Sequence, residues 1–141
     1  MVRQARNADR FQKDKVMDAS TQTALAHDVR TAFDAYEKAL TGNDVEALIN
    51  FFWDDPRSVR LGPDGGAYGY DQIKSFRKAR SPDDLDRDLL RVEINVLADD
   101  IAVANAEYQR KASGRKGAQS QVWQKRGNDW RIISAHVSLR P

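Results

Sequence analysis

The chain has 141 residues, 23 of them Lys or Arg and 21 Asp or Glu, with a formal net charge of +2. This length suits one domain, which we place at residues 20–141, after a polar extension at residues 1–19. The extension carries the whole net charge, so the domain lacks the basic footprint of a nucleic-acid-binding protein. No apolar run approaches the roughly 20 residues of a membrane-spanning helix, and the N-terminus lacks the apolar core of a signal peptide. Since cysteine is absent as well, we expect a cytoplasmic protein without disulfides or thiolate sites.

Three helices are predicted in the first half of the chain. Apolar residues recur at helical spacing from Leu25 to Leu40, and Gly42 is a natural stop. A second helix is expected over VEALINFFW, residues 45–53, ending before a proline that disfavours helical geometry in the residue preceding it. A third helix, DQIKSFRKAR, covers residues 71–80.

Strand patterns dominate the second half. RSVRL, residues 57–61, alternates as one strand and is followed by the turn GPDGG. Four further runs, at residues 89–97, 101–111, 117–126 and 129–139, are separated by breaks too short for anything but antiparallel hairpins. The sequence therefore predicts an α+β domain with helices on one face of a curved antiparallel sheet. This order of elements is similar to the cone-shaped fold shared by nuclear transport factor 2 and ketosteroid isomerase, in which the sheet wraps a long first helix.

The usual catalytic and metal-binding motifs are missing. The chain has two histidines, so a histidine-rich metal site is not expected, and neither a nucleophile elbow nor a phosphate-binding loop is present. We predict no metal and no cofactor. By strand alternation His136 shares a face with Ile132, Ser134 and Ser138, where it would line the wall of a pocket.

One tyrosine and three arginines remain as candidates. Tyr36 lies on the buried stripe of the first helix, and its hydroxyl needs a partner. Arg60 alternates with Val59 and Leu61, so its side chain faces either solvent or a pocket, and a buried guanidinium demands a carboxylate. Arg77 borders the apolar face of the third helix, and Arg80 follows on the same ridge. The alternative is that these arginines are solvated or paired with Asp54, Asp55 or Asp71.

Four segments of the chain resemble the AtzH-like family of the SnoaL and nuclear transport factor 2 superfamily. They are FDAYEKAL, NDVEALINFFWDDPRSVRLG, YGYDQIKSFRKAR and QSQVWQKRGNDWRIISAHVSL, in this order between Phe33 and Leu139. The family motif FxxYExAL places its functional tyrosine at Tyr36, and DPRxxRxG places its functional arginine at Arg60. One departure is RLGPDGGAYGY, where an acidic residue would be expected near Gly66 or Ala67.

The resemblance implies a small homodimer that decarboxylates an open-chain urea carboxylate such as 1-carboxybiuret. It also implies that the protein works in nitrogen catabolism together with amidase-type hydrolases. Other members are associated with oxalurate catabolism. An N-carboxylate releases carbon dioxide once its nitrogen is protonated, so an anion clamp and a proton donor suffice. Arginine supplies the clamp and tyrosine can relay the proton. We therefore assign catalytic roles to Tyr36 and Arg60, and substrate contacts to a further set of residues: Arg77, Phe52, Trp53, Trp123 and His136.

Two other functions are compatible with the sequence. With the same fold, the protein could instead be a non-catalytic accessory subunit that binds a small acid or an amidase. An isomerase or dehydratase of the ketosteroid isomerase type would need an Asp or His base in the pocket, and the pattern places none there. We also expect the homodimer to form through the outer sheet face, which would carry Val103, Val122 and Ile133.

Overall fold

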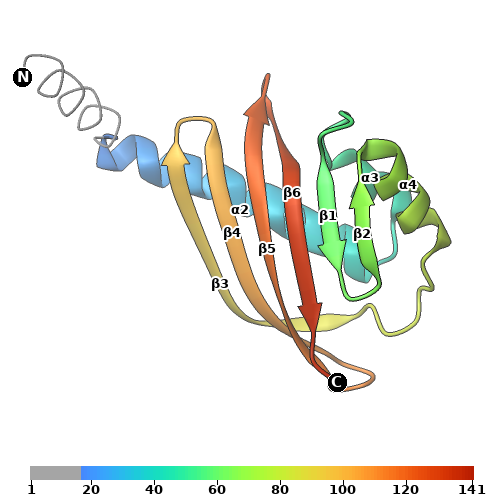
Figure 1. Cartoon of the computed structure of the whole chain (residues 1–141). Coiled ribbons are helices and arrows are strands. Elements are labelled where there is room, and N and C mark those ends of the chain that lie inside the picture. The colour runs from blue at the N-terminus through green and yellow to red at the C-terminus, as the bar shows by residue number, and fades with distance from the viewer. Residues whose placement is uncertain (1–16) are drawn as a thin grey trace, which may run out of the picture.

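The computed structural model describes residues 17–141, which form three helices and one six-stranded sheet (Figure 1). Of the polar extension predicted at residues 1–19, residues 1–16 lie outside the described residues. No helix in the described part of the chain is long and apolar enough to cross a membrane.

Helix α2 (Ala19–Thr41) is the long element around which the domain is built. The Asp18 side chain accepts a hydrogen bond from the Ser20 amide at its start, and Gly42 follows its last turn. Short polar side chains at the residue before a helix, such as Asp18 here, satisfy amides of the first turn that have no partner within the helix. The predicted stripe is confirmed, because Val29, Phe33 and Tyr36 are all buried.

Helix α3 (Val45–Asn50) is shorter than predicted. The amide of Trp53 donates to the carbonyl of Ile132, and the amide of Ile132 donates to the carbonyl of Phe51. Residues 51–53 therefore run beside the last strand instead of continuing the helix, and Phe52 forms an isolated bridge with Ile132. This detour carries the Phe52 side chain into the core.

The sheet has the order β2-β1-β6-β5-β4-β3. Its strands are β1 (Val59–Gly62), β2 (Gly65–Tyr68), β3 (Arg87–Ala98), β4 (Ile101–Arg110), β5 (Lys116–Arg126) and β6 (Asp129–Leu139). Neighbours are antiparallel except for β1 and β6, which run parallel. β2 was not predicted, since GPDGG was interpreted as a turn alone and the edge strand begins within it. Figure 1 shows α2 crossing behind the strands, with α3 and α4 (Tyr70–Ala79) at the β1–β2 end.

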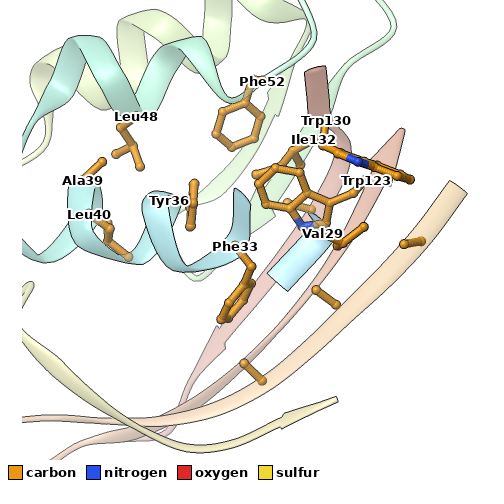
Figure 2. Packing of buried hydrophobic residues seen from close by; sticks show 14 of the residues in the cluster. Val29, Phe33, Tyr36, Ala39, Leu40, Leu48, Phe52, Trp123, Trp130 and Ile132 are labelled. Atoms are coloured by element: carbon orange, nitrogen blue, oxygen red, sulfur yellow. The ribbon is translucent and has the colours of Figure 1, made fainter. Parts of the chain in front are cut away.

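The core fills the space between α2 and the inner face of the sheet (Figure 2). Side chains from α2, from the segment after α3 and from β5 and β6 point toward one another, among them Tyr36, Phe52, Trp123 and Ile132. The inner face of β4 is lined by small side chains, Ala102, Ala104 and Ala106. Small residues there let the helix approach the sheet closely, as close packing requires.

A bulge in β6 changes which side chains face the core. Val122 pairs with Ser134 and Trp123 pairs with Ile132, so Ile133 is the extra residue. A bulge shifts the alternation by one position: Ile132 and Ala135 are both buried, while His136 is exposed. The expectation that His136 shares a face with Ile132 was therefore wrong, because strict alternation does not hold across a bulge.

Candidate functional site

Tyr36 and Arg77 meet in the interior, one from α2 and the other from α4. The Arg77 Nη2 atom donates to the Tyr36 hydroxyl oxygen over 2.9 Å. The two side chains are 2% and 4% exposed, respectively. The hydroxyl accepts this bond and donates to no acceptor within residues 17–141, so its own proton is free for a further partner.

Arg60 points from β1 to the inner face of the sheet and is 3% exposed, so it is not solvated. Its neighbour in β6 is the buried Ala135. The guanidinium folds over Gly62, where a β-carbon would lie only 2.5 Å from Nη1. The absence of a side chain at Gly62 therefore provides the space for the Arg60 head group.

The ring of Phe76 brings three arginines into one group, which we call the arginine cluster: Arg60, Arg77 and Arg80. Their Cζ atoms lie 4.2, 5.7 and 5.9 Å from the ring centroid, respectively. Phe76 was not among the predicted site residues. Its place one residue before Arg77 on a helix that covers β1 was the available signal, since an aromatic face attracts guanidinium groups.

The arginine cluster has no salt-bridge partner within residues 17–141, although the exposed Asp64 carboxylate acts on Arg60 from a distance and partly offsets the lowering of its pKa. None of the ion pairs formed by these residues includes Arg60, Arg77 or Arg80. Asp55, one of the suggested partners, pairs with Arg57 instead, at 2.9 Å. Three buried donor atoms have no partner at all: Arg60 Nε, Arg77 Nε and Arg77 Nη1. Unpaired buried donors of this kind are rare, and each calls for an explanation such as a bound anion, an ordered water or a catalytic role.

A second buried arginine environment shows what a paired arginine looks like in this fold. Arg87 bonds the Glu37 carboxylate and also donates to Gln119 Oε1 over 2.7 Å. Gln119 in turn donates to Glu37, and the Arg87 guanidinium stacks on the Tyr108 ring at 4.1 Å. This network is satisfied internally, whereas the arginine cluster is not.

The electrostatics of the cluster follow from this difference. Burial lowers the pKa of Arg60 to about 10, and the nearby charge of Arg77 acts in the same direction. Burial also lowers the pKa of Arg80, with Arg77 and Arg110 adding repulsion. Each lowered pKa means that the charged guanidinium is less stable in the folded protein than it is in water. An anion bound among the three guanidiniums would reverse that effect.

The strand pairing explains why Arg60 lacks a partner. Arg60 stands directly opposite Ala67 in the β1–β2 ladder, and both side chains are buried on the inner face. Directly opposite residues have β-carbons roughly 4.5–5.5 Å apart, so an acidic residue at position 67 would be within reach of the guanidinium. The departure noted in the sequence, no acid near Gly66 or Ala67, thus removes a carboxylate that could have paired with Arg60.

Aromatic side chains surround Tyr36 on its other sides. The rings of Phe52 and Trp123 meet it edge-on, each at 6.3 Å between centroids. Phe51, which the sequence analysis did not propose, makes the same kind of contact at 6.0 Å. Two predicted contacts lie elsewhere. Trp53 packs against the guanidiniums of two other arginines, Arg57 and Arg126, and His136 faces outward beside Ser120 and Ser138.

Four hollows on the surface lie away from the arginine cluster. One of about 420 Å³ is bounded by Asp54, Asp55 and Asp71, which carry the wrong charge for an anion. The other three, of about 330, 290 and 160 Å³, adjoin Ala118 of β5. None of the four is lined by Arg60, Arg77 or Arg80.

Comparisons with known proteins agree with this fold and with the motifs. The AtzH-like family model matches residues 18–141, whereas no curated protein matches the chain. A solved structure of a protein of unknown function from Pectobacterium atrosepticum is 44% identical, with a TM-score of 0.80, over 91% of this chain and 97% of that one. A cystatin-like fold protein from Burkholderia xenovorans is 33% identical, with a TM-score of 0.79, over 85% and 96% of the two chains.

A more distant structure, described as a putative ketosteroid isomerase from Parabacteroides distasonis, is 23% identical, with a TM-score of 0.66, over 77% and 84%. At that identity the likeness concerns the fold alone. Structures described as nuclear transport factor 2-like also match the chain, which confirms the predicted fold. With the family model covering nearly all of the described residues, the chain belongs to the AtzH-like family.

Proposed function

We propose that the protein is a cofactor-independent decarboxylase of a small urea-type N-carboxylate, such as 1-carboxybiuret, in nitrogen catabolism. The observation that carries this proposal is the arginine cluster, with unpaired buried donors and no ion pair among the described residues, beside the Tyr36 hydroxyl. Arginine donates two parallel hydrogen bonds to a carboxylate and keeps its charge at neutral pH. Unpaired donors of Arg60 and Arg77 can therefore hold the carboxylate of such a substrate.

Tyr36 is the proton donor in this proposal. The bond between the substrate nitrogen and the carboxylate carbon breaks, carbon dioxide leaves, and the nitrogen keeps the electron pair. The Tyr36 hydroxyl gives its proton to that nitrogen and recovers one from water. The hydrogen bond from Arg77 stabilises the negative charge on the tyrosine oxygen while the proton is away.

The aromatic side chains around Tyr36 support the same chemistry. Phe51, Phe52 and Trp123 pack around the ring, and the hydroxyl has one hydrogen-bond partner among the described residues, Arg77. A site with little water strengthens the interactions between a bound anion and the guanidiniums. The carboxylate would also lose its hydration on entering, which favours release of neutral carbon dioxide.

An isomerase or dehydratase that needs a carboxylate base is less well supported. Glu37, the buried carboxylate nearest to Tyr36 in sequence, is held by Arg87 and Gln119. His136, the other potential base, faces away from Tyr36. The accessory-subunit alternative needs only anion binding, which the arginine cluster would provide without turnover.

Carbon dioxide release separates the two remaining functions. Purified protein is incubated with 1-carboxybiuret, allophanate and oxalurate, and carbon dioxide is followed above the uncatalysed background. We expect accelerated release from at least one N-carboxylate. Binding of small carboxylates without acceleration would instead favour the accessory subunit.

We also propose a homodimer formed through the outer sheet face. Val103 and Val122 stand opposite each other on that face and are half-exposed, and Tyr68 is 62% exposed. No helix of the described residues covers this side (Figure 1). An amidase-type hydrolase is the further partner that we propose, because decarboxylation of an N-carboxylated urea leaves an amide-type product.

A further inference from the structure

The arginine cluster carries more positive charge than a substrate with one carboxylate can balance. A single carboxylate placed between Arg60 and Arg77 would satisfy their unpaired donors but would neutralise only one charge. Arg80 stands against the same ring, at 5.9 Å from the Phe76 centroid, and has no carboxylate partner within residues 17–141. The excess is therefore concentrated around one side chain and is not spread over the surface.

The three arginines differ in their access to solvent. Arg60 and Arg77 are 3% and 4% exposed, whereas Arg80 is half-buried. Arg80 is the residue at which α4 ends, with an extended backbone, so its side chain leaves the helix at the rim of the cluster. The geometry thus has an inner pair of guanidiniums beside Tyr36 and a third one further out.

Elsewhere in the described residues, arginines near Arg80 have carboxylate partners. Arg110 pairs with Asp84 at 3.4 Å, and Arg87 pairs with Glu37. Both add to the positive surroundings of Arg80, whose pKa burial and these neighbours lower. The opposing position that could have supplied an internal carboxylate to the cluster is Ala67.

We propose that the arginine cluster binds a small acid with two carboxylates, one held by Arg60 and Arg77 beside Tyr36 and the other by Arg80. This rests on the proposed function for the reacting carboxylate and extends it to the substrate class, a urea-type N-carboxylate with a second carboxylate at its far end. 1-Carboxybiuret, which has a single carboxylate, would engage Arg60 and Arg77 but not Arg80. After carbon dioxide leaves, the second carboxylate stays on the product. Arg80 is then a specificity-determining residue.

The test measures binding and needs no turnover. Malonate, succinate and glutarate are titrated into the protein by calorimetry at constant ionic strength, against propionate and butyrate. We expect the best dicarboxylate to bind at least tenfold more tightly than either monocarboxylate. Arg80→Gln should abolish that preference, because dicarboxylate binding then falls to the level of monocarboxylate binding.

Two further variants control for overall charge. Lys78→Gln removes a positive charge from the exposed side of the same helix and should leave the preference intact. Ala67→Asp places a carboxylate opposite Arg60 and should weaken dicarboxylate binding at least tenfold. Inorganic phosphate is titrated as well, because it carries its negative charge on one group, whereas a dicarboxylate carries it on two separated groups.

Each other outcome has a distinct meaning. Equal binding of mono- and dicarboxylates, or tighter binding of phosphate than of every dicarboxylate, would overturn the two-carboxylate proposal and leave the decarboxylase proposal standing. A dicarboxylate preference that survives Arg80→Gln would overturn the role of Arg80. Absence of any carboxylate binding would overturn both proposals, whereas a confirmed preference without carbon dioxide release would overturn the decarboxylase alone.

Discussion

Replacing Arg60 with methionine should stabilise the protein in the absence of ligand. Methionine keeps the unbranched stem over Phe76 and removes the buried charge. The lowering of the Arg60 pKa from its ordinary value to about 10 corresponds to about 3 kcal/mol of disfavoured charge. Loss of the contact with the Phe76 ring, at 4.2 Å, offsets about 1–2 kcal/mol of this. We therefore expect a net gain of about 1–2 kcal/mol.

The matched control is Arg87→Met, which removes the other buried arginine. Its partner Glu37 would be left as an uncompensated buried carboxylate, and breaking a buried pair in this way typically costs about 3–5 kcal/mol. The same substitution should thus change stability in opposite directions at the two sites. The pKa of Arg60 is lowered in the folded protein, so its destabilising effect is fully present below about pH 10 and fades only above it.

Urea unfolding of the ligand-free proteins at pH 7.5 measures both differences, and thermal unfolding provides a second readout. At this chain length 1 kcal/mol corresponds to roughly 4 °C. If Arg60→Met destabilises the protein by more than 2 kcal/mol, as Arg87→Met should, then Arg60 is a structural residue. The inference that it awaits an anion would be refuted.

Four other expectations concern turnover and assembly. Tyr36→Phe keeps the ring and should lower the rate of decarboxylation by about 10²-fold or more, with binding little changed. The control Tyr108→Phe, which removes a different buried hydroxyl, should retain the native rate. Equal rates in the two variants would show that Tyr36 is an ordinary core residue. Arg60→Lys retains the charge but not the planar fork, so most turnover should be lost while the melting temperature hardly moves; a much lower melting temperature would argue for a structural ion pair. Gly62→Ala should push the Arg60 guanidinium aside and reduce kcat/KM by roughly 10–100-fold, with little loss of stability, since the end of a flexible side chain can move; unchanged kcat/KM would show that the head group need not lie there. Light scattering at micromolar concentration should give a dimer, and Val122→Asp should dissociate it; a monomeric native protein would exclude the proposed interface.

Much of the fold was predictable because its signals are local. The stripe from Leu25 to Leu40 fixes the buried face of α2, and the short breaks between the last four strands force antiparallel pairing. The end of α3 and the edge strand β2 were not predictable in this way. Both depend on pairing with distant segments, β6 for residues 51–53 and β1 for residues 65–68.

In the candidate site, too, the residues with local signals were predictable and those placed by distant packing were not. The apolar stripe of the first helix placed Tyr36 on an inward face, whereas alternation left Arg60 facing either solvent or a pocket and the family motif singled it out. Their meeting with Arg77 around Phe76 depends on how α4 packs on β1, which no local pattern encodes. His136 was misplaced because the bulge at Ile133 leaves no mark in the hydrophobic pattern, and Trp53 because the predicted helix ended three residues late.

The central claim is that this arginine cluster and Tyr36 release carbon dioxide from an N-carboxylate. Its most direct test is carbon dioxide formation from 1-carboxybiuret by purified protein, with Tyr36→Phe and Arg60→Lys assayed in parallel. We predict formation well above the uncatalysed rate, together with the decarboxylated amide product in equal amount, and a fall of at least about 10²-fold in Tyr36→Phe. Formation at the uncatalysed rate with 1-carboxybiuret and allophanate alike, by a folded protein that still binds small carboxylates, would contradict the claim.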